Sequence, residues 1–200
     1  MTKVKICGIT NVRDAIAAAD AGADFIGLVM SPSPRRVDIS AVDSIVSAIG
    51  SRPCTVGVFA SEADLLAYDR DTDCQLDYYQ VYFDYRSLPV RQPKRDWIRS
   101  FWITDTVNSL DSNHSGLFLY DFKKSSVDTM HDLCSERQDV VTQRTFIAGN
   151  LTVENVGTIV SELRPFGIDV ARGTELSPGV KDVTKMKQFI QRVKNVQTIS

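Results

Sequence analysis

The stretch Val4-Lys5-Ile6-Cys7-Gly8-Ile9-Thr10 begins with strand-forming residues and turns at a glycine towards a helical pattern. That helix is expected over Asp14-Ala15-Ile16-Ala17-Ala18-Ala19, with Thr10 or Asn11 as its cap. Cys7 then lies at the carboxyl end of a strand, the end at which α/β sheets and barrels bind ligands. A thiol at this position is either a reactive group or a small buried apolar side chain, and position alone leaves both interpretations open.

Apolar, β-rich runs recur along the whole chain, and most of them are followed by a helical pattern. The runs expected to be strands are 4–9, 24–30, 55–60, 76–82, 97–104, 117–122, 145–148 and 167–170. The helices expected after them include 39–49, 62–68, 153–163 and 183–193. Because alternating strands and helices form a parallel sheet, the pattern predicts an α/β fold, a compact (β/α)8 TIM barrel. Residues 1–200 are expected to form one such domain, near the lower size limit of about 200 residues for this fold.

A barrel of this size has to shorten some of its connections. Residues 83–96 contain Pro89 and Pro93 and few apolar residues, which predicts a loop or a single turn there. The fifth connection, over 105–115, has room for about two helical turns. The fourth and fifth helices are therefore expected to be shortened or missing.

Composition and charge limit the kinds of partner. A formal charge of −2, with acids and bases interspersed, argues against nucleic acid and against a membrane surface. The chain has no run of eighteen apolar residues and no signal-peptide pattern, so we expect it in the cytoplasm. Its four cysteines lack CxxC spacing and it has only two histidines, which argues against a metal site, a disulfide framework and a His-based triad.

Local runs in several places resemble the phosphoribosylanthranilate isomerase family of tryptophan biosynthesis, in the same order along the chain. The runs are VKICGIT (4–10), AGADFIG (21–27), SPRRV (33–37), VGVF (56–59), RPFGIDV (164–170) and SPGVKD (177–182). The similarity is strong over roughly residues 3–60 and 145–193 and weak between them. The family is a (β/α)8 barrel without metal or cofactor that converts an aminoaldose phosphate into an aminoketose by an Amadori rearrangement. The resemblance therefore implies a small sugar-phosphate substrate, no cofactor, and a monomer or homodimer.

That reaction needs an acid to open the sugar ring and a base to remove a proton from the second sugar carbon. The resemblance implies that Cys7, as thiolate, is the base and that Asp121, at the end of the sixth strand, is the acid. A free thiol is mostly protonated at neutral pH, so the site has to favour the thiolate or work with a small active fraction. Alternation places Lys5 on the same side of its strand as Cys7, and we expect Lys5 to lower the pKa of Cys7. The alternatives are a buried ion pair for Lys5 and a helix cap for Asp121.

The phosphate is expected in the loops after the seventh and eighth strands, where a glycine lets the backbone approach an anion closely. The residues assigned to this site are Gly149, Asn150, Ala171, Arg172 and Gly173. Arg172, which stands where the family usually has a small residue, is either a phosphate ligand or a solvent-exposed arginine. By resemblance Arg35 meets the anthranilate carboxylate, although the neighbouring Arg36 is a competing candidate.

The chain departs from the family pattern in its middle third. The fourth strand ends in Gln80-Val81-Tyr82-Phe83 where the family has a Gln-Leu-His-Gly-like run, and Gln80 is kept as a candidate supporting residue. The loop after Asp121 has no glycine, so the mobile lid of the family is lost, and Lys123 or Lys124 either bind phosphate or are simply solvated. Asp169 in the eighth strand is expected to be structural rather than catalytic.

Two rival functions stay open on sequence grounds. The first is a related sugar-phosphate isomerase or aldolase on the same barrel. The second is a barrel that keeps a phosphate site but only binds, or stabilises a partner enzyme. The presence of both Cys7 and Asp121 favours an active isomerase over either rival.

Overall fold

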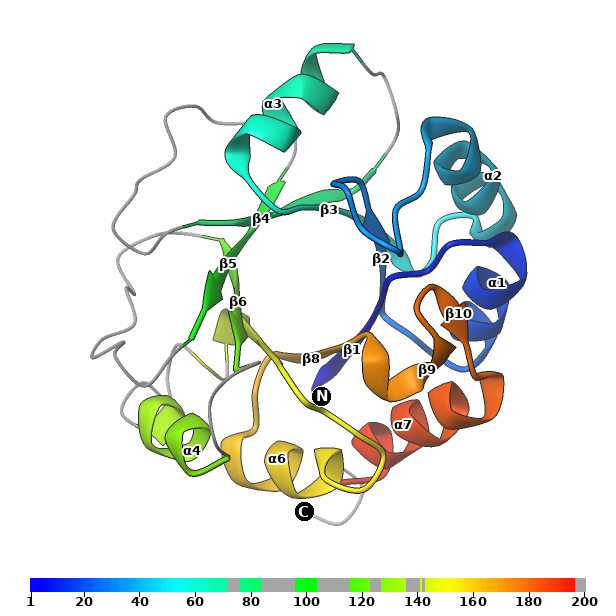
Figure 1. Cartoon of the computed structure of the whole chain (residues 1–200). Coiled ribbons are helices and arrows are strands. Elements are labelled where there is room, and N and C mark those ends of the chain that lie inside the picture. Colours follow the sequence, from blue (N-terminus) through cyan, green and yellow to red (C-terminus); the bar gives the residue numbers. More distant parts are fainter. Residues whose placement is uncertain are drawn as a thin grey trace.

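The computed structural model describes residues 1–71, 76–83, 96–103, 116–122, 127–135, 141 and 143–196. Eight parallel strands close into a barrel in sequential order (Figure 1). The strands are β1 (Lys3–Cys7), β2 (Phe25–Val29), β3 (Cys54–Phe59), β4 (Tyr78–Tyr82), β5 (Asp96–Trp102), β6 (Leu117–Asp121), β7 (Thr145–Ala148) and β8 (Gly167–Val170). The first strand pairs with both β2 and β8, which closes the barrel. The predicted (β/α)8 class is confirmed, and each predicted strand lies within two residues of an observed one.

The described helices lie on the outside of the barrel (Figure 1). They are α1 (Val12–Asp20), α2 (Ile39–Ile49), α3 (Glu62–Asp71), α4 (Val127–Ser135), α6 (Val156–Leu163) and α7 (Val183–Asn195). Of the two candidate caps for α1, Asn11 is the one whose side chain accepts a hydrogen bond from the Asp14 N–H, at 2.9 Å. The predicted shortening of the fourth and fifth helices concerns residues 84–95 and 104–115, which lie outside the described residues.

The helix expected over 153–163 begins later than predicted, at Val156. The side chain of Asn155 turns back and accepts a hydrogen bond from the Thr152 N–H at 2.8 Å. This bond closes a turn over residues 152–155 and delays the first helical residue.

The strands carry two separate apolar layers because successive side chains point to opposite faces. One layer fills the barrel interior and consists of Cys7, Phe25, Val56, Val58, Ile98, Leu119, Phe146 and Ala148. The other, larger layer lies between the strands and the surrounding helices and includes Ile6, Ile26, Val81, Phe118 and Ile168. Within the interior, Phe25 packs edge-on against Phe146 with 5.2 Å between ring centroids, so the barrel is a filled core below its mouth.

A feature that the sequence did not predict follows β8. A short 3-10 helix, η1 (Arg172–Thr174), leads into an antiparallel hairpin formed by β9 (Glu175–Ser177) and β10 (Val180–Lys181). We expected only a short connecting segment here. The hairpin lies beside β1 and α7 at the rim of the barrel (Figure 1), and two of its side chains enter the site described below.

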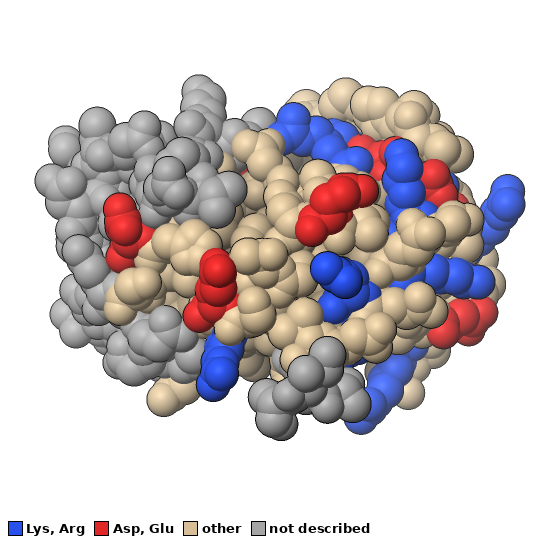
Figure 2. Space-filling model, turned by 90° about the horizontal axis from the view of Figure 1, so that it is seen from below, with Lys and Arg blue, Asp and Glu red and all other residues tan. Residues whose placement is uncertain are grey.

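On the face that Figure 2 shows, the surface charges are distributed as the sequence predicts. Basic and acidic side chains are interspersed there among uncharged residues. Among the described helices, none is long and apolar enough to cross a membrane.

Candidate active site

A cavity of about 740 Å³ opens at the carboxyl ends of the barrel strands. Every strand contributes a residue to its lining: Cys7, Val29, Val58, Tyr82, Trp102, Asp121, Ala148 and Asp169. Enzymes with this fold place their active sites at this end of the barrel, and the volume suits a small organic molecule. The cavity is therefore the candidate active site.

The structure brings most of the predicted site residues to this one cavity. The lining residues predicted from the sequence are Cys7, Arg35, Asp121, Gly149, Asn150, Ala171, Arg172 and Gly173. Lys5 and Gln80 are fully buried in the interior and do not line it. Arg36 is exposed and does not line the cavity, whereas Arg35 does. Lys123 and Lys124 lie outside the described residues.

Cys7 is buried, with 8% of the residue exposed, and a buried ion pair lies beside it. Lys5 Nζ lies 2.8 Å from Asp169 Oδ1, and both side chains are buried. A Cβ built on Gly27 would lie 2.9 Å from both Cys7 Sγ and Lys5 Nζ. The glycine therefore leaves open the space in which the thiol and the ammonium group meet.

The pKa of Cys7 is raised above its ordinary value, and burial is the largest cause. Lys5 and Lys181 act in the opposite direction because a nearby cation favours the thiolate, whereas Asp169 adds to the rise. Burial alone would lower the pKa of Lys5, but Asp169 and Cys7 outweigh it and keep Lys5 protonated. The effect expected of Lys5 on the Cys7 pKa thus has the predicted sign but is smaller than the effect of burial.

Asp169, which is expected to be structural, has two contacts of interest. It holds Lys5 from within the barrel, and it also lines the cavity. Its inward orientation follows from strand alternation, since β8 places Gly167 and Asp169 on the same side. Its ion-pair partner Lys5 is 164 residues away in the sequence, so no local sequence pattern predicts their contact.

Asp121 is the last residue of β6 and lines the same cavity as Asp169. Tyr82 Oη donates a hydrogen bond to Asp121 Oδ2 at 3.2 Å. The ring of Tyr82 stacks on Trp102 with 4.1 Å between centroids and 16° between planes. Burial, followed by the charge of Asp121, raises the pKa of Tyr82 well above its ordinary value, so the phenol keeps its proton. Sequence analysis missed Tyr82 and Trp102, although alternation from Gln80 would have placed Tyr82 on the inner face.

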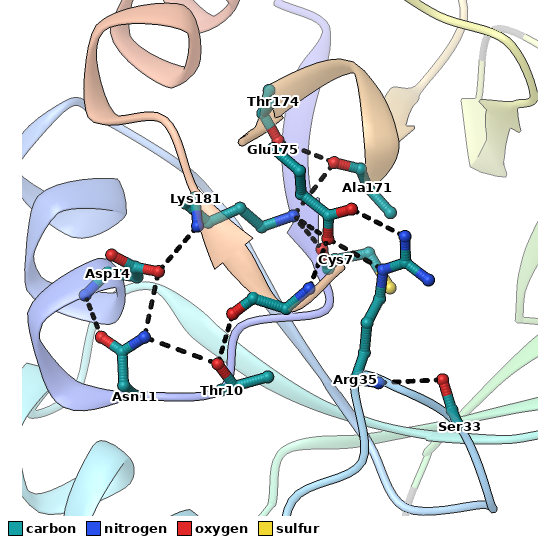
Figure 3. A network of polar contacts seen from close by, with 11 residues as sticks. Cys7, Thr10, Asn11, Asp14, Ser33, Arg35, Ala171, Thr174, Glu175 and Lys181 are labelled. Atoms are coloured by element: carbon teal, nitrogen blue, oxygen red, sulfur yellow. Dashed lines mark hydrogen bonds and ion pairs between the residues drawn. The ribbon is translucent and has the colours of Figure 1, made fainter. Parts of the chain in front are cut away.

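Arg35 reaches the cavity across Gly8, where a Cβ would come within 2.6 Å of Arg35 Cδ. Its guanidinium donates two hydrogen bonds to Glu175, from Nε to Oε1 at 2.8 Å and from Nη2 to Oε2 at 2.7 Å. Lys181 joins the same cluster, since its Nζ lies 3.2 Å from Glu175 Oε1 and donates to the Cys7 carbonyl at 2.7 Å (Figure 3). Sequence analysis assigned no role to Glu175 or Lys181.

The two predicted phosphate loops are packed against each other. Gly149 and Asn150 both have positive φ, 108° and 49°, a conformation that glycine and asparagine adopt most readily. A Cβ on Gly173 would clash with the Leu151 carbonyl oxygen, so the loop after β8 meets the loop after β7 backbone to backbone. Arg172 is exposed, and its Nη2 donates to Asn150 Oδ1 at 3.1 Å.

The other described cysteines differ from Cys7 in their position. Cys54 and Cys134 are free thiols that do not line the cavity, and burial raises the pKa of Cys134 to about 12. Within the described ranges, no group of three or more His, Cys, Asp and Glu side chains is placed to hold a metal ion. Cys7 is therefore the described thiol that is placed to react with a ligand in the cavity.

A closed parallel barrel with a thiol, a carboxyl group and an arginine around one cavity at its carboxyl end has the architecture of the (β/α)8-barrel enzymes. The comparison with known families identifies the particular one. The family model described as N-(5'phosphoribosyl)anthranilate (PRA) isomerase matches residues 4–192, and the chain belongs to this family.

Individual relatives agree over almost the full length. The N-(5'-phosphoribosyl)anthranilate isomerase of Syntrophomonas wolfei is 33% identical over 211 aligned residues, which cover 99% of this chain and 100% of that protein. Among solved structures, TrpF from Jonesia denitrificans superposes with a TM-score of 0.82 at 28% identity, covering 98% of both chains. A phosphoribosyl anthranilate isomerase was solved in complex with reduced 1-(o-carboxyphenylamino)-1-deoxyribulose 5-phosphate, and it has a TM-score of 0.76 at 26% identity, covering 98% of this chain and all of its own.

Proposed function

We propose that this protein converts N-(5-phosphoribosyl)anthranilate into 1-(2-carboxyphenylamino)-1-deoxyribulose 5-phosphate, the Amadori rearrangement of tryptophan biosynthesis. The observation that carries the proposal is the convergence of Cys7 and Asp121 on one cavity from β1 and β6. The reaction needs a base and an acid on different sides of one sugar, and two strands on different sides of a barrel supply that arrangement. Membership of the family supports the same reaction.

In the proposed mechanism Asp121 donates its proton to the ring oxygen of the ribose while the bond between that oxygen and the first carbon breaks. The nitrogen of the anthranilate stabilises the resulting cation as an iminium group. Cys7, as thiolate, then removes the proton from the second carbon and leaves an enolamine. The enolamine becomes the aminoketose when its first carbon gains a proton and its hydroxyl group loses one.

The environment of Cys7 determines how the rate depends on pH. Because burial raises the pKa of Cys7, only a small fraction is thiolate at neutral pH. The fraction of Cys7 that is thiolate should therefore rise with pH until the thiol ionises. We infer that Lys5 supports the reaction by increasing the thiolate fraction against the effect of burial.

The two ends of the substrate are assigned to different groups at the rim. We infer that the phosphate lies between the loops over 149–152 and 171–173, where Gly149 and Gly173 allow a close approach of backbone N–H groups. Arg172, exposed and bonded to Asn150, is available as a charge-assisted donor at the edge of this site. The anthranilate carboxylate is assigned to Arg35.

The setting of the protein completes the proposal. We infer that residues 1–200 act as a single barrel domain in the cytoplasm, as a monomer or homodimer, without a cofactor. The supporting observations are the family match over residues 4–192 and a charge pattern that suits neither nucleic acid nor a membrane surface.

The test is an assay of the purified protein with phosphoribosylanthranilate, followed by the loss of the substrate's fluorescence. Replacing Cys7 by Ser and, separately, Asp121 by Asn should each lower kcat by about 10² to 10⁴ while the thermal unfolding midpoint stays near that of the parent. Cys54→Ser is the matched control, since Cys54 lies outside the cavity. A parent protein without conversion would refute the function, and full activity in both variants would refute the site assignment.

A further inference from the structure

Only one of the two hydrogen-bonding edges of the Arg35 guanidinium is occupied. The edge formed by Nε and Nη2 is filled by the carboxylate of Glu175. The other edge, formed by Nη1 and the second N–H of Nη2, has no side-chain partner among the residues that the structure describes. The Arg35 side chain is 19% exposed and lines the cavity, so this second edge is available to a ligand.

Glu175 is held in place as firmly as it holds Arg35. Its side chain is buried and accepts hydrogen bonds from Lys181 Nζ at 3.2 Å and from the Gly179 N–H at 3.4 Å. Burial alone would raise the pKa of Glu175, but Arg35 and Lys181 lower it below its ordinary value, and the group is therefore charged. The Arg35 guanidinium is thus fixed on one edge by the Glu175 carboxylate, which is itself held by Lys181 and Gly179.

The charges of this cluster do not balance. Arg35 and Lys181 carry two positive charges, and Glu175 carries one negative charge. Asp14 accepts its hydrogen bonds from the Lys181 backbone N–H and from Asn11, away from the guanidinium (Figure 3), and Asp169 is paired with Lys5. One positive charge therefore remains among these three side chains, and an anionic group of the ligand beside Arg35 would neutralise it, as the thiolate of Cys7 does in part.

We propose that Glu175 is a positioning residue that makes the site specific for a planar carboxylate. By filling one edge of Arg35, it leaves a single fork of two parallel N–H donors directed at the ligand, a geometry that matches a carboxylate. By balancing the charge of Lys181, it leaves one unit of positive charge for that carboxylate. This inference rests on the proposed function, in which the carboxylate belongs to the anthranilate ring.

Lys181 extends the same arrangement to the rest of the cavity. Besides Glu175, its ammonium group donates to the carbonyl of Cys7 at 2.7 Å and to the carbonyl of Ala171 at 3.0 Å (Figure 3). The buried Lys181 side chain therefore connects three parts of the site. These are Glu175, which holds Arg35, the end of β1 at Cys7, and the loop at Ala171 that is assigned to the phosphate. Through these contacts, a substrate bound by Arg35 keeps a fixed position relative to Cys7, the proposed base.

The test compares two ligands in the parent protein and in Glu175→Gln. One ligand is reduced 1-(o-carboxyphenylamino)-1-deoxyribulose 5-phosphate, and the other is the same compound without the carboxyl group. We expect the variant to bind the carboxylated ligand at least about tenfold more weakly, whereas its affinity for the second ligand changes less than about twofold. In the isomerase assay, KM should rise by a similar factor while kcat changes less than about threefold.

Glu162→Gln is the matched control, because Glu162 Oε2 lies 2.8 Å from His131 Nε2 and neither residue lines the cavity. It should leave both affinities unchanged. Glu175→Asp is the second variant in case the first does not fold, since it keeps the charge but is too short to meet both Arg35 donors and should show the same selective loss. Equal weakening of both ligands, or no weakening, would overturn the proposal. A parent protein that binds both ligands but does not turn over substrate would refute the isomerase function instead, because the binding measurements do not depend on turnover.

Discussion

The two sides of the cavity are stabilised by different interactions. On the side of β8, β1 and β2, charged groups meet in buried or partly buried pairs, Lys5 with Asp169 and Arg35 with Glu175. On the side of β4, β5 and β6, the predicted acid Asp121 is contacted by the neutral phenol of Tyr82, which is stacked on Trp102. The two sides therefore control protons by different means.

The difference suits the two proposed roles. A base that works as thiolate benefits from nearby cations, because they favour its charged form. A general acid has to keep its proton, and a cation beside it would favour the wrong, ionised form. The neutral Tyr82 lies where the resemblance leads us to expect histidine. Its hydrogen bond to Asp121 favours the ionised carboxylate less than a cation at the same place would.

The largest change should follow from breaking the buried ion pair. Lys5→Met removes the ion-pair partner of Asp169 inside the barrel, and we expect the free energy of unfolding to fall by about 3 to 5 kcal/mol, measured by urea denaturation. The double variant Lys5→Met with Asp169→Leu removes both charges and should recover most of the loss. A single variant as stable as the parent would show that this side does not depend on the ion pair.

The same variant tests the electrostatic control of Cys7. In the parent, the pH at which half of Cys7 reacts with an alkylating agent should lie above the ordinary thiol pKa, since burial raises the pKa of Cys7. Lys5 favours the thiolate, so its removal should shift that midpoint to still higher pH and slow alkylation at pH 7. Lys3→Met, on the same strand but in contact with Asp24 at 3.1 Å, is the control and should leave the profile unmoved.

A smaller change is expected on the aromatic side. Tyr82→Phe keeps the stacking on Trp102 but removes the hydrogen bond to Asp121, and we expect kcat to fall about tenfold, which corresponds to about 1.4 kcal/mol. Tyr78→Phe, at the other end of the same strand, is the control. An unchanged kcat in Tyr82→Phe would mean that this hydrogen bond does not position the acid.

The smallest effect concerns the polar groups buried below the aromatic side. Neither polar atom of the Gln80 side chain has a hydrogen-bond partner among the described residues. Gln80→Met keeps the shape and removes the buried polar atoms, so we expect the free energy of unfolding to rise by about 1 kcal/mol. Urea denaturation and the isomerase assay of Gln80→Met test this expectation. A less stable variant with a lower kcat would show instead that Gln80 supports the site through its polar atoms.

The extent of the sequence-based prediction can be argued from particular elements. Helix α2 and strands β7 and β8 have the predicted bounds, because their apolar periodicity and the glycines, prolines or caps around them are local signals. The hairpin of β9 and β10 was missed because its two strands have only three and two residues, too short for a periodic pattern. The roles of Glu175 and Lys181 were missed with it.

The sequence by itself determined the barrel, the place of Cys7 at a strand end, and the glycines of the two loops to which we assign the phosphate, since each of these depends on the order of neighbouring residues. Only the tertiary structure decided which charged groups meet. Arg35 and Glu175 are 140 residues apart, and Lys5 and Asp169 are 164 apart. They come into contact because the last strand pairs with the first and because the hairpin folds back over the rim, and no local pattern specifies the partner of a charge across such a closure.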